Sequence, residues 1–123
     1  MRNLALNALR KEPLRLDTKT YFANEYVYAK DVALALHLAC KAQNLQQRIY
    51  NAGTGIISTP ADIAQALGEL VPRLDVRVVG ETEKDGRELP LDLSRSQAEL
   101  GYSPQFPLRR ALQDYMEELK TEG

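Results

Sequence analysis

The sequence predicts a small α+β domain of about four helices and three or four short strands. Apolar residues recur at intervals of three and four over several long stretches, which is the spacing of a helix face. The β-branched and aromatic stretches are short and few, and they do not alternate with helices often enough to form a doubly wound parallel sheet. We therefore expect residues 1–123 to form a single domain.

The helical spacing falls in residues 31–44, 59–71, 94–100 and 107–120, and residues 2–10 resemble the end of a further amphipathic helix. The clearest beginning is at Thr59, because a threonine cap, Pro60 at the first helical position and Asp62 in the first turn all favour one. Ser94 is the expected cap of the short helix that Gly101 ends.

The expected strands are residues 14–16, 21–28, 48–51 and 76–79. Residues 21–28 have the richest aromatic and β-branched content, which is typical of a strand. Between the predicted strand 48–51 and the helix that starts at Thr59, Gly53 and Gly55 indicate a turn.

Composition limits the function classes. The formal net charge is −1 and the pI is about 5.9, which gives no electrostatic basis for binding nucleic acid or an anionic membrane. No apolar run approaches the roughly 20 residues of a membrane span, and the N-terminus shows no secretory signal. The single cysteine, Cys40, lies in a helical apolar pattern and is expected to be buried. These features fit the cytoplasm.

Catalytic, cofactor and metal motifs are weak. Tyr26 and Lys30 match the pattern Tyr-x-x-x-Lys, but we do not expect a catalytic pair, because side chains at this spacing in a strand lie about 13 Å apart. The glycines after Asn51 lack the spacing of a phosphate-binding loop. The only histidine, His37, has no partners at metal-ligand spacing, so no metal site is expected.

Three blocks of sequence carry a family resemblance. One is Arg87-Glu-Leu-Pro-Leu-Asp92, followed by a Ser-Arg-Ser-Gln-Ala helix and Leu-Gly-Tyr-Ser-Pro. The others are Tyr26-Val-Tyr-Ala-Lys-Asp-Val-Ala and Asn51-Ala-Gly-Thr-Gly. Together they resemble the C-terminal substrate-binding portion of the extended short-chain dehydrogenases, the NAD-dependent epimerase/dehydratase family.

The resemblance implies a parent enzyme that uses bound NAD or NADP to oxidise a sugar hydroxyl transiently in a nucleotide-diphosphate sugar. It makes Arg87, Asn24 and Tyr28 the candidate substrate-binding residues. A guanidinium binds phosphate oxygens through paired hydrogen bonds, which suits Arg87 to the diphosphate. Asn24 departs from the family, in which an arginine commonly stands at this position.

The resemblance also implies that this chain lacks the Rossmann half that would hold the dinucleotide. We therefore expect the chain alone to bind no cofactor and to be inactive, as a truncated or split substrate-binding domain. The alternative is a non-enzymatic interaction module. The sugar, the nucleotide and the choice between epimerase, dehydratase and reductase stay open.

The expected partners are a separate nucleotide-binding half or a second copy of the chain. Either would cover apolar surface that otherwise faces water. The residues expected on that surface are Leu4, Leu9, Tyr21, Tyr26 and Tyr28.

Overall fold

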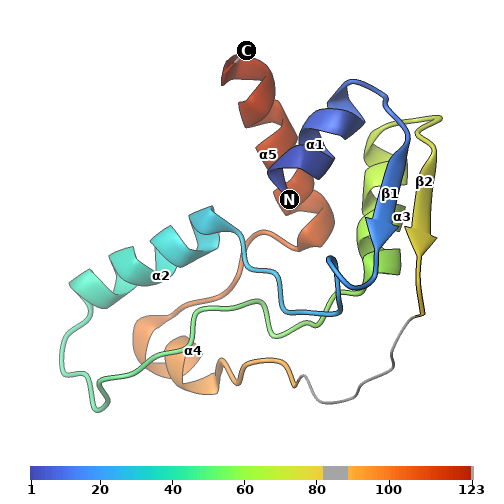
Figure 1. The fold of residues 1–123 in the computed structure, drawn as a ribbon. Coiled ribbons are helices and arrows are strands. Elements are labelled where there is room, and N and C mark those ends of the chain that lie inside the picture. Colours follow the sequence, from blue (N-terminus) through green and yellow to red (C-terminus); the bar gives the residue numbers. More distant parts are fainter. Residues whose placement is uncertain (82–88, 123) are drawn as a thin grey trace.

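The computed structural model describes residues 1–81 and 89–122. In these residues the chain forms five helices and a two-stranded parallel sheet, which confirms the α+β class (Figure 1). The elements, in chain order, are α1 (Arg2–Leu9), β1 (Leu14–Asp17), α2 (Ala29–Lys41), α3 (Pro60–Leu70), β2 (Val76–Val79), α4 (Ser94–Leu100) and α5 (Leu108–Glu122).

The sheet pairs two short strands that lie far apart in the sequence. β1 and β2 run parallel, with Leu14 opposite Val76 and Asp17 opposite Val79. Parallel neighbours need a long crossover connection, and here α2 and α3 lie between the two strands in the sequence. Leu14 and Leu16 are buried while the alternate residues of β1 are exposed, so one face of the sheet packs against the helices.

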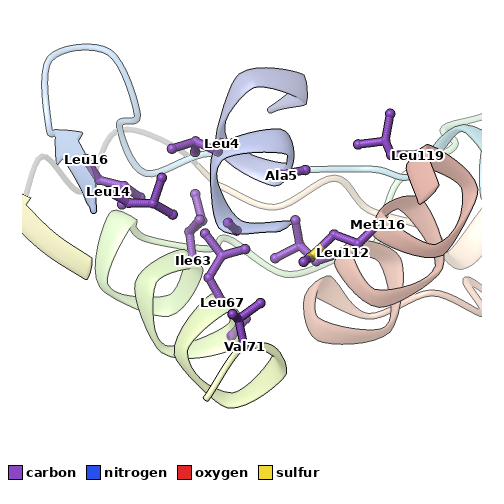
Figure 2. Close-up of a cluster of buried hydrophobic side chains, with 12 residues drawn as sticks. Leu4, Ala5, Leu14, Leu16, Ile63, Leu67, Val71, Leu112, Met116 and Leu119 are labelled. Atoms are coloured by element: carbon purple, nitrogen blue, oxygen red, sulfur yellow. The ribbon is translucent and has the colours of Figure 1, made fainter. Parts of the chain in front are cut away.

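The larger buried cluster, which we call the main core, joins α1, β1, α3 and α5 (Figure 2). Ile63 and Leu67 of α3 are completely buried at its centre. They are four residues apart and therefore lie on one helix face. Its buried residues are Leu4, Ala5, Ala8, Leu14, Leu16, Ile63, Ala66, Leu67, Val71, Leu112, Met116 and Leu119.

α3 begins as the sequence predicts. The Thr59 side chain accepts a hydrogen bond from the Asp62 amide, and the Asp62 carboxylate accepts one from the Thr59 amide. This reciprocal cap satisfies two amides that the first turn would otherwise leave unpaired. It fixes the start of the helix that buries Ile63 and Leu67 in the main core.

A smaller group, which we call the second cluster, lies where α2 meets α4. Its buried residues are Ala35, Leu100 and Tyr102, with half-buried side chains of α2 and of residues 50–52 around them. In Figure 1 these two helices lie together, apart from α1, α3, α5 and the sheet.

Two predicted strands are wrong. Among the described residues, 21–28 form no ladder and pair through one antiparallel bridge between Asn24 and Ser58, while residues 48–51 are irregular. The composition of 21–28 reflects packing instead, because Tyr21 and Tyr26 lie half-buried against the main core. Strand propensity measures fit to a half-buried surface, and such a surface need not be part of a sheet.

Three smaller predictions also need correction. Cys40 is exposed, because the buried face of α2 runs through Asp31 and Ala35. Leu4, expected on an exposed surface, is buried in the main core. Ser94 is the first residue of α4 and does not cap it; its amide donates to the Asp92 carboxylate.

Candidate functional site

Tyr28 lies where the start of α2 meets α5. Its hydroxyl donates to Asp114 Oδ2 at 2.8 Å, and its ring meets the rings of Phe106 and Tyr115 edge-on. Lys30 reaches the same carboxylate at 2.5 Å and also contacts Glu118 at 2.8 Å. A candidate substrate-binding residue is thus part of a polar cluster that joins two helices.

Burial and the neighbouring Asp114 carboxylate keep the Tyr28 phenol protonated. Burial, together with the hydrogen bond to the Asp114 carboxylate, raises the pKa of Tyr28 to about 12. The hydrogen bonds from Lys30 and Tyr28 lower the pKa of Asp114, and the same carboxylate raises the pKa of Lys30. A tyrosine that transfers protons near neutral pH needs the opposite shift, so this geometry suits Tyr28 to donating a hydrogen bond.

Tyr28 also forms one wall of a largely apolar cavity of about 260 Å³. The cavity lies between the segment 26–28 and the first half of α5. Its other lining residues are Met1, Tyr26, Val27, Leu108, Ala111, Leu112 and Tyr115.

Asn24 does not line this cavity. Its backbone is paired with Ser58, and its side-chain oxygen accepts a hydrogen bond from the Glu25 amide at 2.8 Å. Arg87, the third candidate residue, lies outside the described residues. The structure therefore places Asn24 and Tyr28 in different local surroundings, although only four positions separate them.

Glu25 is a functional candidate that the sequence analysis missed. One carboxylate oxygen accepts the amides of Thr54 and Gly55, and the other accepts the amide of Leu91. Three segments thereby meet at one side chain. No local pattern identifies such a residue, because its partners are 29, 30 and 66 positions away.

The glycine turn of residues 51–55 also accepts hydrogen bonds from α4 and from a residue just after α4. Tyr102 donates its hydroxyl to the Gly53 carbonyl at 2.6 Å, and Ser96 donates to the Asn51 carbonyl at 2.5 Å. The Asn51 side chain in turn donates to the Asp92 carbonyl. This turn borders a polar hollow of about 190 Å³, lined by Ile49, Asn51, Asp92, Ser94 and Arg95.

Asp31, part of the second sequence block, has a structural role. It is completely buried, and its two carboxylate oxygens accept the amides of Gln105 and Phe106 at 2.8 and 3.1 Å. The carboxylate thus joins the first turn of α2 to the chain that enters α5.

Tyr26 and Lys30 have different partners. The Tyr26 hydroxyl donates to the Phe22 carbonyl, and the Lys30 ammonium contacts the two carboxylates of α5. The expected strand does not separate them, since Lys30 already belongs to α2. That Tyr26 and Lys30 do not form a catalytic pair stays a prediction, which these contacts support.

That this chain binds no dinucleotide stays a prediction, and two features of the described residues support it. Such a site needs a glycine-rich turn between a strand and a helix whose free N-terminus faces the pyrophosphate. Here β1 leads into Thr18 and Lys19, and the N-terminus of α3 is filled by its own Thr59 and Asp62 side chains. In the same residues, no three His, Cys, Asp or Glu side chains group as a metal would need, and no helix has the length and apolarity to cross a membrane.

Neither a family model nor a curated protein sequence matches the chain. Solved structures do. The chain is similar to UDP-glucose 4-epimerase of Thermotoga maritima, solved with UDP-glucose, with 25% identity over 96% of the chain and a TM-score of 0.71. A partial-consensus L-threonine 3-dehydrogenase shows 27% identity over 97%, with a TM-score of 0.74.

The ADP-L-glycero-D-manno-heptose-6-epimerase of Helicobacter pylori shares the fold, with 23% identity over 96% of the chain and a TM-score of 0.75. The chain spans only 38%, 40% and 36% of the lengths of the epimerase, the dehydrogenase and this enzyme. The resemblance to a portion of the NAD-dependent epimerase/dehydratase fold is thus confirmed.

Proposed function

We propose that this chain is the substrate-binding portion of an NAD-dependent epimerase or dehydratase and binds a nucleotide-diphosphate sugar. The observation that carries the proposal is the similarity to an epimerase solved with UDP-glucose, which extends over nearly all of this chain. We place the protein in the cytoplasm, where its single cysteine stays reduced.

Arg87 is the proposed diphosphate ligand, with Asn24 and Tyr28 contributing polar contacts. A guanidinium stays charged at any working pH and presents two parallel donors to phosphate oxygens. A charge-assisted contact of this kind is worth about 1.5–3 kcal/mol, or roughly ten- to a hundredfold in affinity. The proposal gives this chain no NAD site and no catalytic residue, so the isolated chain is inactive.

Titration calorimetry with UDP-glucose and with NAD tests the proposal. We expect UDP-glucose to bind and NAD not to bind. Arg87→Lys should weaken UDP-glucose binding and Arg87→Ala should weaken it more, because lysine keeps the charge but loses the paired donors. Arg15→Lys is the matched control, on the exposed side of β1. Equal affinities for wild type and both Arg87 variants would contradict the assignment of Arg87.

A second substrate class is an amino acid, favoured by the similarity to the L-threonine 3-dehydrogenase. Adding L-threonine to the titrations separates the two classes. Binding of L-threonine without UDP-glucose would replace the nucleotide sugar in the proposal. The fold would be the same in both cases, since one fold can carry different sites.

The alternative from a different class is an interaction module that binds a partner or a second copy. Exposed apolar side chains favour it: Leu36 is 64% exposed, and Ile49 and Ile56, which flank the glycine turn, are 75% and 61% exposed. Light scattering of the chain at rising concentration measures self-association. Dimers without ligand binding would favour the module.

A further inference from the structure

The contacts of Glu25 differ from those of the other exposed or half-buried acidic side chains described above. Its carboxylate accepts three backbone amides, from Thr54 at 2.7 Å, Gly55 at 2.8 Å and Leu91 at 2.6 Å. Hydrogen bonds to an ionised carboxylate are roughly twice as strong as those between neutral groups. Two adjacent amides on one oxygen form the kind of concave site that binds anions elsewhere.

The missing side chain at Gly53 leaves room for the Glu25 carboxylate. A Cβ atom added at Gly53 would overlap the Glu25 Oε1 and would lie 3.0 Å from the Leu91 side chain. The third residue of the Asn-x-Gly-x-Gly block is therefore glycine for a steric reason, because the carboxylate occupies that space.

Hydrogen bonds also hold the backbone around Glu25 in place. Its amide donates to the side chain of Asn24, whose backbone exchanges hydrogen bonds of 3.0 and 2.9 Å with Ser58. The carboxylate therefore links three segments in a defined arrangement: residues 24–25, the glycine turn, and the chain at Leu91 that leads into α4.

We propose that Glu25 is a positioning residue for ligand binding: by holding the glycine turn and the Leu91 segment against Asn24, it builds the wall that receives the nucleotide-diphosphate sugar. The inference rests on the proposed function. A wall that is ordered before binding loses less conformational entropy when the ligand arrives, which raises affinity without a direct contact.

The experiment compares UDP-glucose affinity in the full chain and five variants, two of them controls, at a temperature at which circular dichroism shows all of them folded. Glu25→Gln keeps the shape and removes the charge, and Gly53→Ala displaces the carboxylate and leaves its charge. We expect each to lower affinity about tenfold. The double variant should be no weaker than either alone, because both remove one interaction.

Two controls isolate the effect. Glu12→Gln removes the same charge between α1 and β1, and Gly68→Ala adds the same methyl group where nothing lies within 4 Å. Both should bind UDP-glucose like the wild type. In the ligand-free chains, NMR resonances of the Thr54, Gly55 and Leu91 amides should shift in Glu25→Gln and Gly53→Ala and stay in place in the controls.

The outcomes separate this inference from the proposed function. If the wild type binds UDP-glucose and both Glu25→Gln and Gly53→Ala bind it with the same affinity, the positioning role alone is overturned. No wild-type binding of UDP-glucose would overturn the proposed function and the positioning role with it, whatever the amide resonances show. Failure of Glu25→Gln to fold, with normal affinity in Gly53→Ala, would make Glu25 a purely structural residue and overturn the inference.

Discussion

The main core and the second cluster are stabilised by different interactions. The main core buries twelve apolar residues, eleven from three helices and one strand and Val71 from just after α3. The second cluster buries three, and long-range hydrogen bonds between side chains and backbone surround it: Ser96 and Tyr102 donate to backbone carbonyls, and Asp31 accepts from backbone amides. Apolar packing is non-directional and tolerates small shifts, whereas a buried hydrogen bond fixes position and is costly to leave unmade. The glycine turn borders the second cluster, and its position is set by the hydrogen bonds from Ser96 and Tyr102.

The largest expected effect is in the main core. Ile63→Ala removes a completely buried side chain and leaves a cavity among packed helices, which should cost about 2–5 kcal/mol in free energy of unfolding. Urea unfolding followed by circular dichroism measures it. Leu36→Ala, at an exposed position of α2, is the control and should change stability by about 0.5 kcal/mol or less. Similar losses in both variants would refute the packing described for α3.

The second-largest effect is expected at Asp31, whose carboxylate joins α2 to the chain entering α5. Asp31→Asn replaces one acceptor oxygen by an amide group, which then faces a backbone donor. We expect a loss of about 1.5–3 kcal/mol, the range for hydrogen bonds to charged groups. Amide hydrogen exchange should quicken at Gln105 and Phe106 more than in α3. The same increase in exchange rate along the whole chain would show that Asp31 has no specific role at this junction.

Tyr102→Phe should have a smaller effect. It keeps the buried ring and removes only the hydroxyl that donates to the Gly53 carbonyl. The expected cost is about 1 kcal/mol, measured by the same urea unfolding. Tyr50→Phe is matched to it, because that hydroxyl bonds to Glu99 at a more exposed position, and it should cost less. The reverse order would mean that the second cluster does not depend on its buried hydrogen bond.

The same contrast explains what the sequence could predict. The helix spanning Pro60–Leu70 and its buried residues Ile63 and Leu67 follow from local spacing and a local cap. The contacts of Glu25 and Asp31 do not, because their partners lie 29 to 75 positions away and are backbone amides, which carry no residue identity. Residues 21–28 were predicted as a strand because composition alone does not distinguish a ladder from aromatic packing.

For the candidate site, the sequence motifs identified the glycine turn and Tyr28 but not how they are held. The pattern Asn-x-Gly-x-Gly predicts a turn, and only the structure shows that Gly53 leaves room for the Glu25 carboxylate. Tyr28 was selected by resemblance, and its hydrogen bond to Asp114 spans 86 positions. The assignments of Arg87, Asn24 and Tyr28 to substrate stay predictions.

The smallest effect at neutral pH should come from the Lys30–Asp114 pair that connects α2 to α5 outside both buried groups. Its side chains are 44% and 29% exposed, and solvent screens such pairs strongly. The contribution of this pair to stability should instead be recognised by its dependence on pH. Hydrogen bonds from Lys30 and Tyr28 lower the pKa of Asp114 in the folded chain. The unfolded chain therefore binds the proton more readily, and the pair stabilises the fold only while Asp114 is ionised.

This stabilisation should be fully present above the ordinary carboxyl pKa of about 3.9 and should be lost as pH falls through the lowered pKa of folded Asp114. Asp114→Asn cannot titrate at this position. The difference in unfolding temperature between wild type and Asp114→Asn should therefore be constant from neutral pH down to about 4 and shrink below it. Glu117→Gln, on the same helix and outside the Lys30 contacts, controls for the lost charge. A difference that stayed constant through the acid range would show that the folded chain does not favour ionised Asp114.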